Sequence, residues 1–268
     1  MEKRLLDELE LGSVATLYHL ADRPASAPAH PAPREAARPP AAAVHVVSEA
    51  PSGRAAPDDA ARRAIAAMDW DALEAAVRTC TACGLCKQRK QAVFGVGNES
   101  APWLFVGEGP GADEDEQGEP FVGQAGKLLD AMMAALGIKR GREAYIANVV
   151  KCRPPGNRTP TPEEAAACAP FLDRQIELIA PKLIVALGKT AAIRLLATEA
   201  SLASLRGRVH RYRGTPLVVT YHPAYLLRNL PDKAKAWDDL LLARRTLRAI
   251  EALAHATPVA MQDASRLK

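Results

Sequence analysis

The chain has 268 residues, of which 48% are hydrophobic and 25% are charged, so it can build a hydrophobic core in one or two domains. No apolar run reaches the roughly 18 residues that a membrane-spanning helix needs, which excludes a helical membrane protein. The 35 Lys and Arg residues against 31 Asp and Glu residues leave a net charge of +4, which by itself does not indicate a nucleic-acid-binding protein.

The N-terminal part of the chain has two regions of different composition. Residues 1–22 carry leucines at helical spacing, and we expect a short amphipathic segment that either docks back on the domain or binds in a groove on an unidentified protein partner. Its acidic residues argue against a mitochondrial targeting sequence. Residues 23–60 form a linker in which positions 23 to 57 hold 8 Pro and 12 Ala, too little apolar surface for a core. We expect this linker to be disordered.

The folded domain is predicted at residues 61–255, followed by a flexible tail at 256–268. Apolar runs predict strands at 103–106, 145–150, 182–187 and 217–220, and helical patterns predict helices at 125–136, 162–179, 190–196 and 232–253. Alternating strands and helices imply right-handed crossovers and a mostly parallel sheet with helices on both faces. The active site of such a sheet lies beyond the carboxyl ends of its strands.

Four of the five cysteines have the spacing C-x2-C-x68-C-x15-C. Cys80, Cys83, Cys152 and Cys168 supply the four thiolates that a structural zinc ion or a [4Fe–4S] cluster requires. The alternatives are buried thiols or two disulfides, and disulfides are disfavoured because no signal peptide is present. Cys86 is a fifth thiol that could replace Cys83 as a ligand.

Polar and aromatic residues lie in or after the first two predicted strands. Glycines in the run from Gly107 to Gly111 allow the backbone to approach a ligand, and Glu108 adds a carboxylate, although a tight turn without a ligand is the plainer reading. Asn148 has a donor and an acceptor, so it can pair with an amide edge or serve as a turn residue. Phe121 could stack on a flat base or pack in the core.

The fourth predicted strand leads into a histidine and an apolar, basic turn. His222 could donate to a developing anion, or it could cap the next helix. The turn that follows could wedge into a nucleic-acid duplex, with Leu226 and Leu227 in the core as the alternative. A basic stretch precedes this strand and could contact phosphates or form a solvated hairpin, and it contains Arg206, Arg208, His210, Arg211 and Arg213 with Tyr212.

These motifs occur together, in one order, between Cys80 and Arg228. They are Gly107-Glu108-Gly109-Pro110-Gly111 with Glu114 and Asp115, Gly118-Glu119-Pro120-Phe121-Val122-Gly123, Asn148-Val149-Val150-Lys151-Cys152-Arg153-Pro154-Pro155, Leu187-Gly188 and His222-Pro223-Ala224-Tyr225-Leu226-Leu227-Arg228. In this combination the chain resembles the family-4 uracil-DNA glycosylases, the iron–sulfur type of bacteria and archaea. The resemblance leaves the N-terminal arm unexplained.

The resemblance implies an α/β fold, a three-layer α/β/α sandwich with a central four-stranded, mostly parallel sheet. It also implies a [4Fe–4S] cluster with Cys86 outside the ligand set, uracil-containing DNA as substrate, and a monomer located in the bacterial cytoplasm at the nucleoid. The residues that it assigns are Glu108 and His222 for catalysis, Gly107, Gly109, Phe121 and Asn148 for uracil, Cys80, Cys83, Cys152 and Cys168 for the cluster, and Leu226, Leu227 and Arg228 for DNA.

In the implied reaction uracil is flipped out of DNA, read by Asn148 and released with help from His222. Glu108 is the candidate for orienting water, with a backbone carbonyl as the alternative, because Gly109 leaves no carboxylate at the next position. Two other readings remain. One is a related cross-linking group that captures the sugar through a histidine, for which His210 is the candidate, and the other is a non-enzymatic iron–sulfur DNA-binding or electron-transfer module.

Overall fold

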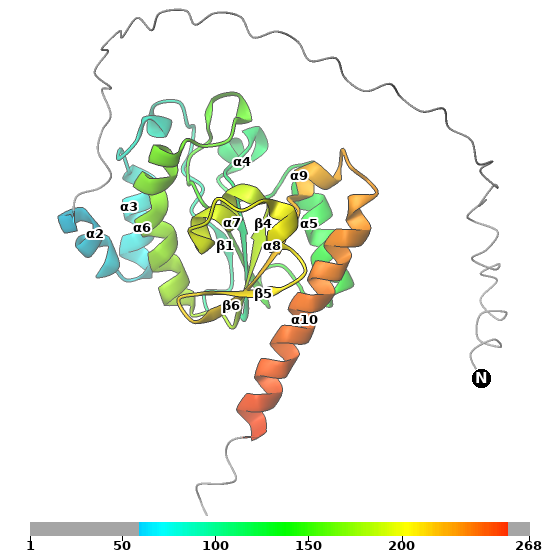
Figure 1. The fold of residues 1–268 in the computed structure, drawn as a ribbon. Helices are drawn as coiled ribbons and strands as arrows, with labels where there is room; N and C mark the ends of the chain where they lie inside the picture. The colour runs from blue at the N-terminus through cyan, green and yellow to red at the C-terminus, as the bar shows by residue number, and fades with distance from the viewer. Residues whose placement is uncertain (1–58, 257–268) are drawn as a thin grey trace, which may run out of the picture. The chain divides into compact units, whose positions relative to one another are not determined.

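The computed structural model of the chain describes residues 59–256 (Figure 1). The predicted amphipathic segment, nearly all of the predicted linker and nearly all of the predicted tail lie outside these residues. The first helix begins at Asp59, two residues before the predicted domain boundary. None of the helices within the described residues is both long enough and apolar enough to cross a membrane.

Strands and helices alternate through most of the described chain. The strands are β1 (Val96–Gly97), β2 (Trp103–Gly107), β3 (Ala144–Asn148), β4 (Leu183–Leu187), β5 (Val209–Tyr212) and β6 (Thr215–Thr220). The helices are α2 (Asp59–Ala66), α3 (Trp70–Thr79), α4 (Ala112–Gln117), α5 (Gln124–Ala135), α6 (Pro162–Ile179), α7 (Lys189–Leu196), α8 (Leu202–Leu205), α9 (Pro223–Leu226) and α10 (Asp232–Ala256), with short 3-10 helices η2 (Gly84–Lys87) and η3 (Pro155–Asn157).

The six strands form one sheet in the order β1-β3-β2-β4-β6-β5. The four central strands are the predicted ones, and they pair in parallel. The prediction of only four strands is wrong at the edges, where β1 and β5 pair antiparallel with β3 and β6. The sequence hides these strands because β1 has two residues and β5 carries His210 and Arg211 rather than an apolar run.

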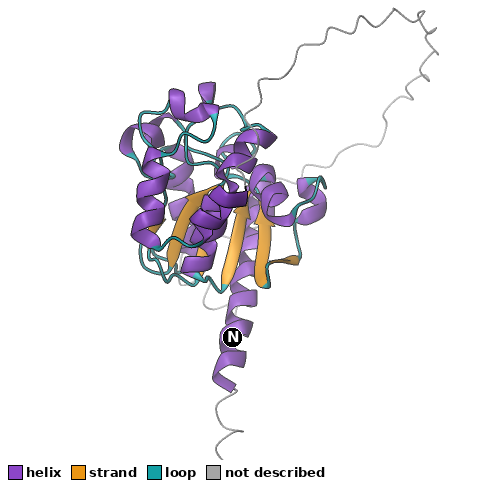
Figure 2. Cartoon of the chain, turned by 90° about the vertical axis from the view of Figure 1, so that its left-hand side faces the viewer, coloured by secondary structure: helices purple, strands orange, loops and turns teal. Residues whose placement is uncertain are grey.

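Helices cover both faces of the sheet, so the predicted three-layer arrangement is confirmed (Figure 2). Successive side chains of a strand point to opposite faces. Leu104 and Val106 of β2 therefore join a core with α3, α6 and α7, whereas Trp103 and Phe105 join a core with α5 and α10. Because both faces of β2, β3 and β4 are covered, all residues of these strands are buried.

Helix α6 begins where its sequence predicts. The Thr161 side chain accepts a hydrogen bond from the Glu164 backbone N–H, and the Glu164 carboxylate accepts one from the Thr161 backbone N–H at 2.8 Å. Pro162 stands in the first turn, where a missing N–H costs nothing. Such a cap stabilises a helix by about 1 kcal/mol. The cap fixes the start of the helix that carries Cys168.

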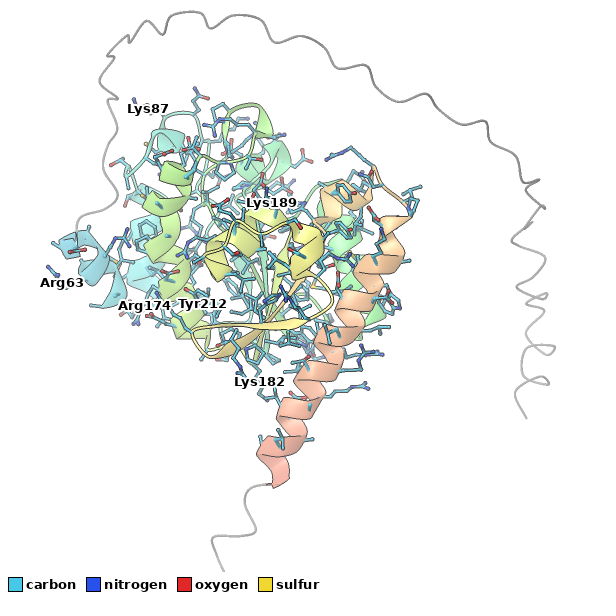
Figure 3. All side chains as sticks on the ribbon, in the orientation of Figure 1. Arg63, Lys87, Arg174, Lys182, Lys189 and Tyr212 are labelled. Carbon is cyan, nitrogen blue, oxygen red and sulfur yellow. The ribbon has the colours of Figure 1, made fainter. Side chains whose placement is uncertain are left out.

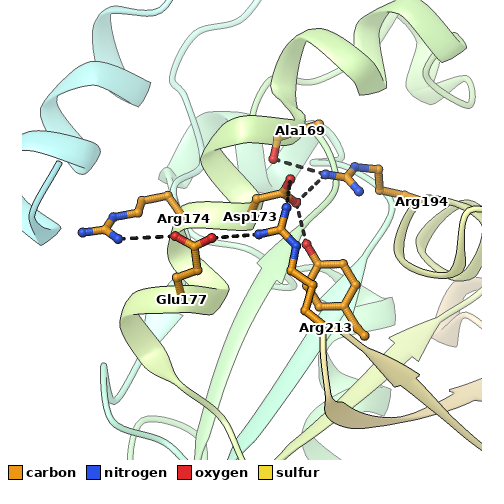
Figure 4. Close-up of polar contacts among 7 residues, drawn as sticks. Ala169, Asp173, Arg174, Glu177, Arg194 and Arg213 are labelled. Carbon is orange, nitrogen blue, oxygen red and sulfur yellow. Dashed lines mark hydrogen bonds and ion pairs between the residues drawn. The ribbon is translucent and has the colours of Figure 1, made fainter. Parts of the chain in front are cut away.

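The predicted basic stretch forms the β5–β6 hairpin and its approach. Arg213 pairs with Glu177 at 2.7 Å and with Asp173 at 3.2 Å, and the Tyr212 hydroxyl donates to Asp173 at 2.8 Å. Arg194 of α7 joins the same carboxylate, so the hairpin is tied to α6 and α7 (Figure 4). These contacts favour the reading of this hairpin as a structural element rather than as a phosphate site.

Candidate functional site

The predicted site residues gather at the carboxyl ends of the parallel strands. Lys182 and Lys189 flank β4 and mark its two ends in Figure 3. A pocket of about 480 Å³ opens at the end that Lys189 marks, beside the helix α7 that begins there. Its lining comprises Glu108, Gly109, Pro110, Gly111, Glu114, Phe121, Ala125, Asn148, Pro154, Asn157, Arg158, Thr159, His222, Ala224, Tyr225 and Arg228.

Asn148 is the polar side chain that the pocket buries most deeply. Only 2% of this residue is exposed, and its Oδ1 has no hydrogen-bond partner among the described residues. An unpaired buried acceptor costs about 1–3 kcal/mol, so a ligand that brings an N–H group would recover this energy. A Cβ on Gly107 would clash with Asn148 Oδ1 and lie 2.6 Å from Phe121 Cζ, which explains the glycine.

Phe121 lines the pocket from a strained backbone. Its φ angle is 56°, in the left-handed region that a bulky residue rarely adopts. Arg140 holds this conformation by donating to the Phe121 carbonyl at 3.0 Å and to the Pro120 carbonyl. Gly126 of α5 has no side chain and leaves room for the same Phe121 carbonyl. Strain of this kind is found at ligand sites, where the surrounding structure maintains it.

Glu114 joins the two loops that carry Gly109 and Phe121. One carboxylate oxygen accepts the Gly111 N–H at 3.0 Å, and the other accepts the N–H groups of Val122 and Gly123 at 3.0 and 3.1 Å. The sequence motif contained Glu114 but gave it no role. Three hydrogen bonds to a charged acceptor make it a positioning residue for both walls of the pocket.

His222 lies two residues after the end of β6 and lines the same pocket as Asn148. Its Nδ1 accepts the Ala224 N–H at 3.2 Å, so the neutral ring carries its proton on Nε2. Burial and, to a smaller extent, Arg228 lower the pKa of His222 to about 4, against the opposing effect of Glu114. The ring stacks on Phe121 with centroids 5.5 Å apart. At neutral pH His222 is therefore an uncharged N–H donor that also caps α9. The capping reading is confirmed, and donation to a developing anion stays a prediction.

Glu108 is held by a residue that the sequence reading missed. The Thr190 hydroxyl in the first turn of α7 donates to Glu108 Oε2. Thr190 lies two residues after the Leu187-Gly188 motif. That proximity is the only sequence signal that could have identified it. Gly109 packs against Val150, since a Cβ there would lie 2.7 Å from Val150 Cγ2. Both Glu108 and Gly109 line the pocket.

The three residues predicted to contact DNA differ in their solvent exposure. Leu226 is 1% exposed and packs between α5 and α10, so its burial removes it from the predicted DNA contacts. Leu227 is 42% exposed, and Arg228 is exposed at the rim of the pocket. His210, the candidate for covalent capture, lies on β5 with Nε2 2.7 Å from the Leu205 carbonyl oxygen and does not line the pocket.

A second pocket contains all five cysteines, each with a free thiol. Cys80 and Cys83 follow α3, Cys152 follows β3, and Cys168 lies in α6. Within residues 59–256, no three His, Cys, Asp or Glu side chains converge tightly enough to hold a single metal ion. A tetrahedral zinc ion requires sulfurs about 2.3 Å from one centre.

N–H groups point at the sulfurs of this pocket. The Lys151 backbone N–H donates to Cys168 Sγ at 3.3 Å, the Ala82 N–H to Cys80 Sγ at 3.4 Å, and the Arg89 guanidinium to Cys152 Sγ at 2.9 Å. Hydrogen bonds to sulfur are among the means by which proteins stabilise iron–sulfur clusters. Burial raises the pKa of Cys168 to about 12, so a bound metal has to displace its proton.

A family model and several known proteins indicate one family. The family model described as the Uracil DNA glycosylase superfamily matches residues 94–241. The Type-4 uracil-DNA glycosylase of Thermotoga maritima is 51% identical over 155 residues, which are 57% of this chain and 80% of that protein. The corresponding protein of Archaeoglobus fulgidus is 46% identical over 159 residues, 56% of this chain and 79% of its own length. That of Pyrobaculum aerophilum is 42% identical over 183 residues, 65% of this chain and 93% of its own length.

Proposed function

The chain belongs to the uracil DNA glycosylase superfamily, and we propose on this premise that it is a type-4 uracil-DNA glycosylase. It flips uracil out of DNA and hydrolyses the N-glycosidic bond, which initiates base excision repair. The observation that carries the proposal is the unpaired Oδ1 of the buried Asn148, in a pocket walled by an aromatic ring and a neutral histidine.

Asn148 distinguishes uracil from cytosine by hydrogen-bond polarity. Uracil N3–H donates to Asn148 Oδ1, and the Asn148 amide group donates to uracil O4. Cytosine presents an amino group and an unprotonated N3 at the same edge, so donors face donors and acceptors face acceptors. The resulting unpaired buried groups exclude cytosine by several kcal/mol, roughly 1–3 for each group. Phe121 stacks on the uracil ring.

His222 stabilises the leaving group. When the bond between C1′ and N1 breaks, its electron pair moves onto uracil, and negative charge develops on O2. The Nε2–H group of the neutral His222 donates to that oxygen, a contribution of roughly 3 kcal/mol for such a donor. Water adds to C1′, and the uracil anion is finally protonated. Glu108, held by the Thr190 hydroxyl, orients this water.

Cys80, Cys83, Cys152 and Cys168 hold a [4Fe–4S] cluster, with Cys86 outside the ligand set. The cluster supplies a rigid covalent link among segments that are far apart in the sequence. This link fixes the loop at residues 153–161, four of whose residues line the uracil pocket. Leu227 fills the space that the flipped base leaves in a duplex, and Arg228 contacts phosphate.

Release of labelled uracil from a single-stranded oligonucleotide tests the proposal. We expect free uracil and an abasic product, and no release of cytosine from a matched oligonucleotide. A gel-stable protein–DNA adduct would instead indicate the cross-linking relatives, and a mobility shift without either product would indicate a binding module. Either of these results would overturn the proposal.

A further inference from the structure

A column of aromatic and cationic side chains stands beside the uracil pocket. The Tyr225 ring lines the pocket and stacks on the Tyr221 ring, with centroids 5.1 Å apart and planes 12° from parallel. The Arg206 guanidinium lies over the Tyr221 ring, 4.2 Å from its centroid. Tyr221 and Tyr225 flank the start of α9, whereas Arg206 approaches from the end of α8.

Three hydrogen bonds to residues of α10 hold this column in place. Arg206 donates to Asp239 Oδ2 at 2.6 Å and to the Lys235 carbonyl at 2.6 Å, and Asp239 is 1% exposed. The Tyr225 hydroxyl donates to Asp232 Oδ2 at 2.7 Å. The rings are therefore held in place before any ligand binds, so a ligand that stacks on them loses little of its affinity to side-chain ordering.

The column ends in an exposed ring at the rim of the pocket. Tyr225 is 36% exposed, although Tyr221 already covers part of it. Arg228 borders the same rim, and its side chain has no ion-pair partner in the part of the chain that the structure describes. A free aromatic face beside an unpaired cation is the combination that binds single-stranded nucleic acid, because every base has a π face and every nucleotide a phosphate.

We propose that Tyr225 is a stacking site for the nucleobase adjacent to the flipped uracil. The neighbouring base continues the column formed by Arg206, Tyr221 and Tyr225, while Arg228 contacts the phosphate between the two nucleotides. This inference rests on the proposed glycosylase function. It extends the substrate from a flipped uracil to a dinucleotide unit within single-stranded DNA.

Replacing the neighbouring base with an abasic residue tests the site. The substrates are a single-stranded oligonucleotide containing uracil, and versions with a tetrahydrofuran residue on the 5′ side, the 3′ side or both. Tyr225→Ala should raise KM about tenfold on the intact substrate with kcat little changed, since base stacking contributes to binding. On the substrate that lacks the stacking base, the KM of the wild type should also be about tenfold higher than on the intact substrate. Tyr225→Ala should cause no additional rise in KM on that substrate.

Three further variants separate stacking from support of the fold. Tyr225→Phe keeps the ring but loses the hydroxyl bond to Asp232, so its KM should lie closer to that of the wild type than to that of Tyr225→Ala. Tyr225→Leu keeps the apolar volume and should behave as Tyr225→Ala does. Leu230→Ala removes an apolar side chain that is 60% exposed outside the pocket and should have no effect.

An equal loss on all four substrates would show that Tyr225 only supports the protein's structure, and wild-type KM for Tyr225→Ala would show that no base stacks there. Both results overturn the inference while uracil release by the wild type upholds the glycosylase function. If the wild type releases no uracil from any substrate, the glycosylase function itself fails.

Discussion

The protonation state of His222 sets the pH range of the proposed reaction. Its pKa is lowered to about 4, so the ring stays a neutral N–H donor throughout the physiological range. We expect kcat for uracil release to be flat from pH 8 to about pH 5 and to change only toward pH 4, where protonation of Nδ1 removes the acceptor for the Ala224 N–H. His222→Ala should slow release about 100-fold with DNA affinity nearly unchanged. A step in kcat near the ordinary histidine pKa of about 6.5 would contradict this account.

The same shift has a consequence for stability. Between pH 6.5 and pH 4 the unfolded chain protonates this histidine, whereas the folded chain does not. His222 therefore lowers the free energy of unfolding as the pH falls through this window, and it has no such effect above it. The melting temperature of His222→Ala relative to the wild type should accordingly rise as the pH is lowered from 7 to 5.

Adding a methyl group at Gly107 tests where the walls of the pocket lie. A Cβ at this position would clash with Asn148 Oδ1 and with the Phe121 ring. Gly107→Ala should lower kcat/KM for uracil release roughly 100-fold, since misplacing reacting groups by about 1 Å has such an effect. Gly84→Ala is the control, because a Cβ there meets nothing within 4 Å. Equal kinetics for the two variants would place the uracil pocket elsewhere.

Some residues of the site could be predicted from the sequence, whereas the residues that hold them in position could not. Asn148 is the last residue of β3 and His222 lies two residues after β6, at the edge where parallel strands bring polar residues together. Thr190 and Arg140 act through contacts with Glu108 and with the Phe121 carbonyl. No periodicity links such partners, because 82 residues separate Thr190 from Glu108. They become visible only when the chain is folded.

At the scale of elements, a buried lysine connects β3 to α6. Lys151 is 1% exposed, and its ammonium group donates to the Asn148 carbonyl at 3.0 Å and to Gln175 Oε1 at 2.5 Å. The Lys151 backbone N–H also donates to Cys168 Sγ. Lys151 thereby connects the cysteine pocket to Asn148 through two hydrogen bonds, one to Cys168 Sγ and one to the Asn148 carbonyl.

Lys151→Met should loosen this connection. Two buried acceptors would lose their partner, at roughly 1–3 kcal/mol each, so the melting temperature and kcat/KM should both fall. Gln175→Met is the matched control: it removes the Lys151–Gln175 bond, together with the bond from Gln175 Nε2 to the Phe94 carbonyl, and leaves the Lys151 bond to Asn148 in place. It should lower the melting temperature with a smaller effect on kcat/KM. Equal kinetic effects of the two variants would show that the Asn148 carbonyl needs no support from Lys151.

The elements that the sequence predicted are those with a strong local pattern. The four central strands are apolar because both of their faces are covered, and α6 has a cap that its sequence spells out. The edge strands β1 and β5 depend on pairing with β3 and β6 instead. An edge strand needs no continuous apolar run, because its solvent side carries polar residues. Burial of Leu226 likewise depends on where α5 and α10 meet.

At the scale of the whole molecule, the cysteine pocket joins the region after α3 to β3 and α6. Cys80→Ala, Cys83→Ala, Cys152→Ala or Cys168→Ala should each remove the cluster and lower the melting temperature, whereas Cys86→Ala should retain about four irons per chain. Iron content and visible absorption after anaerobic purification check this prediction. A zinc-loaded native protein, or a Cys86→Ala variant without iron, would contradict the proposed ligand set.

The central claim is that the amide group of Asn148 reads uracil, with Oδ1 accepting from N3–H and the amide N–H donating to O4. The most direct test is single-turnover release of uracil by Asn148→Asp beside the wild type, on the same single-stranded substrate. A carboxylate cannot donate to O4 and repels that oxygen, so release should slow by at least the roughly 100-fold that a lost buried hydrogen bond to this group implies. The melting temperature is measured beside the release rate, because a carboxylate at a position that is 2% exposed can also destabilise the fold. Wild-type release by Asn148→Asp would contradict the account.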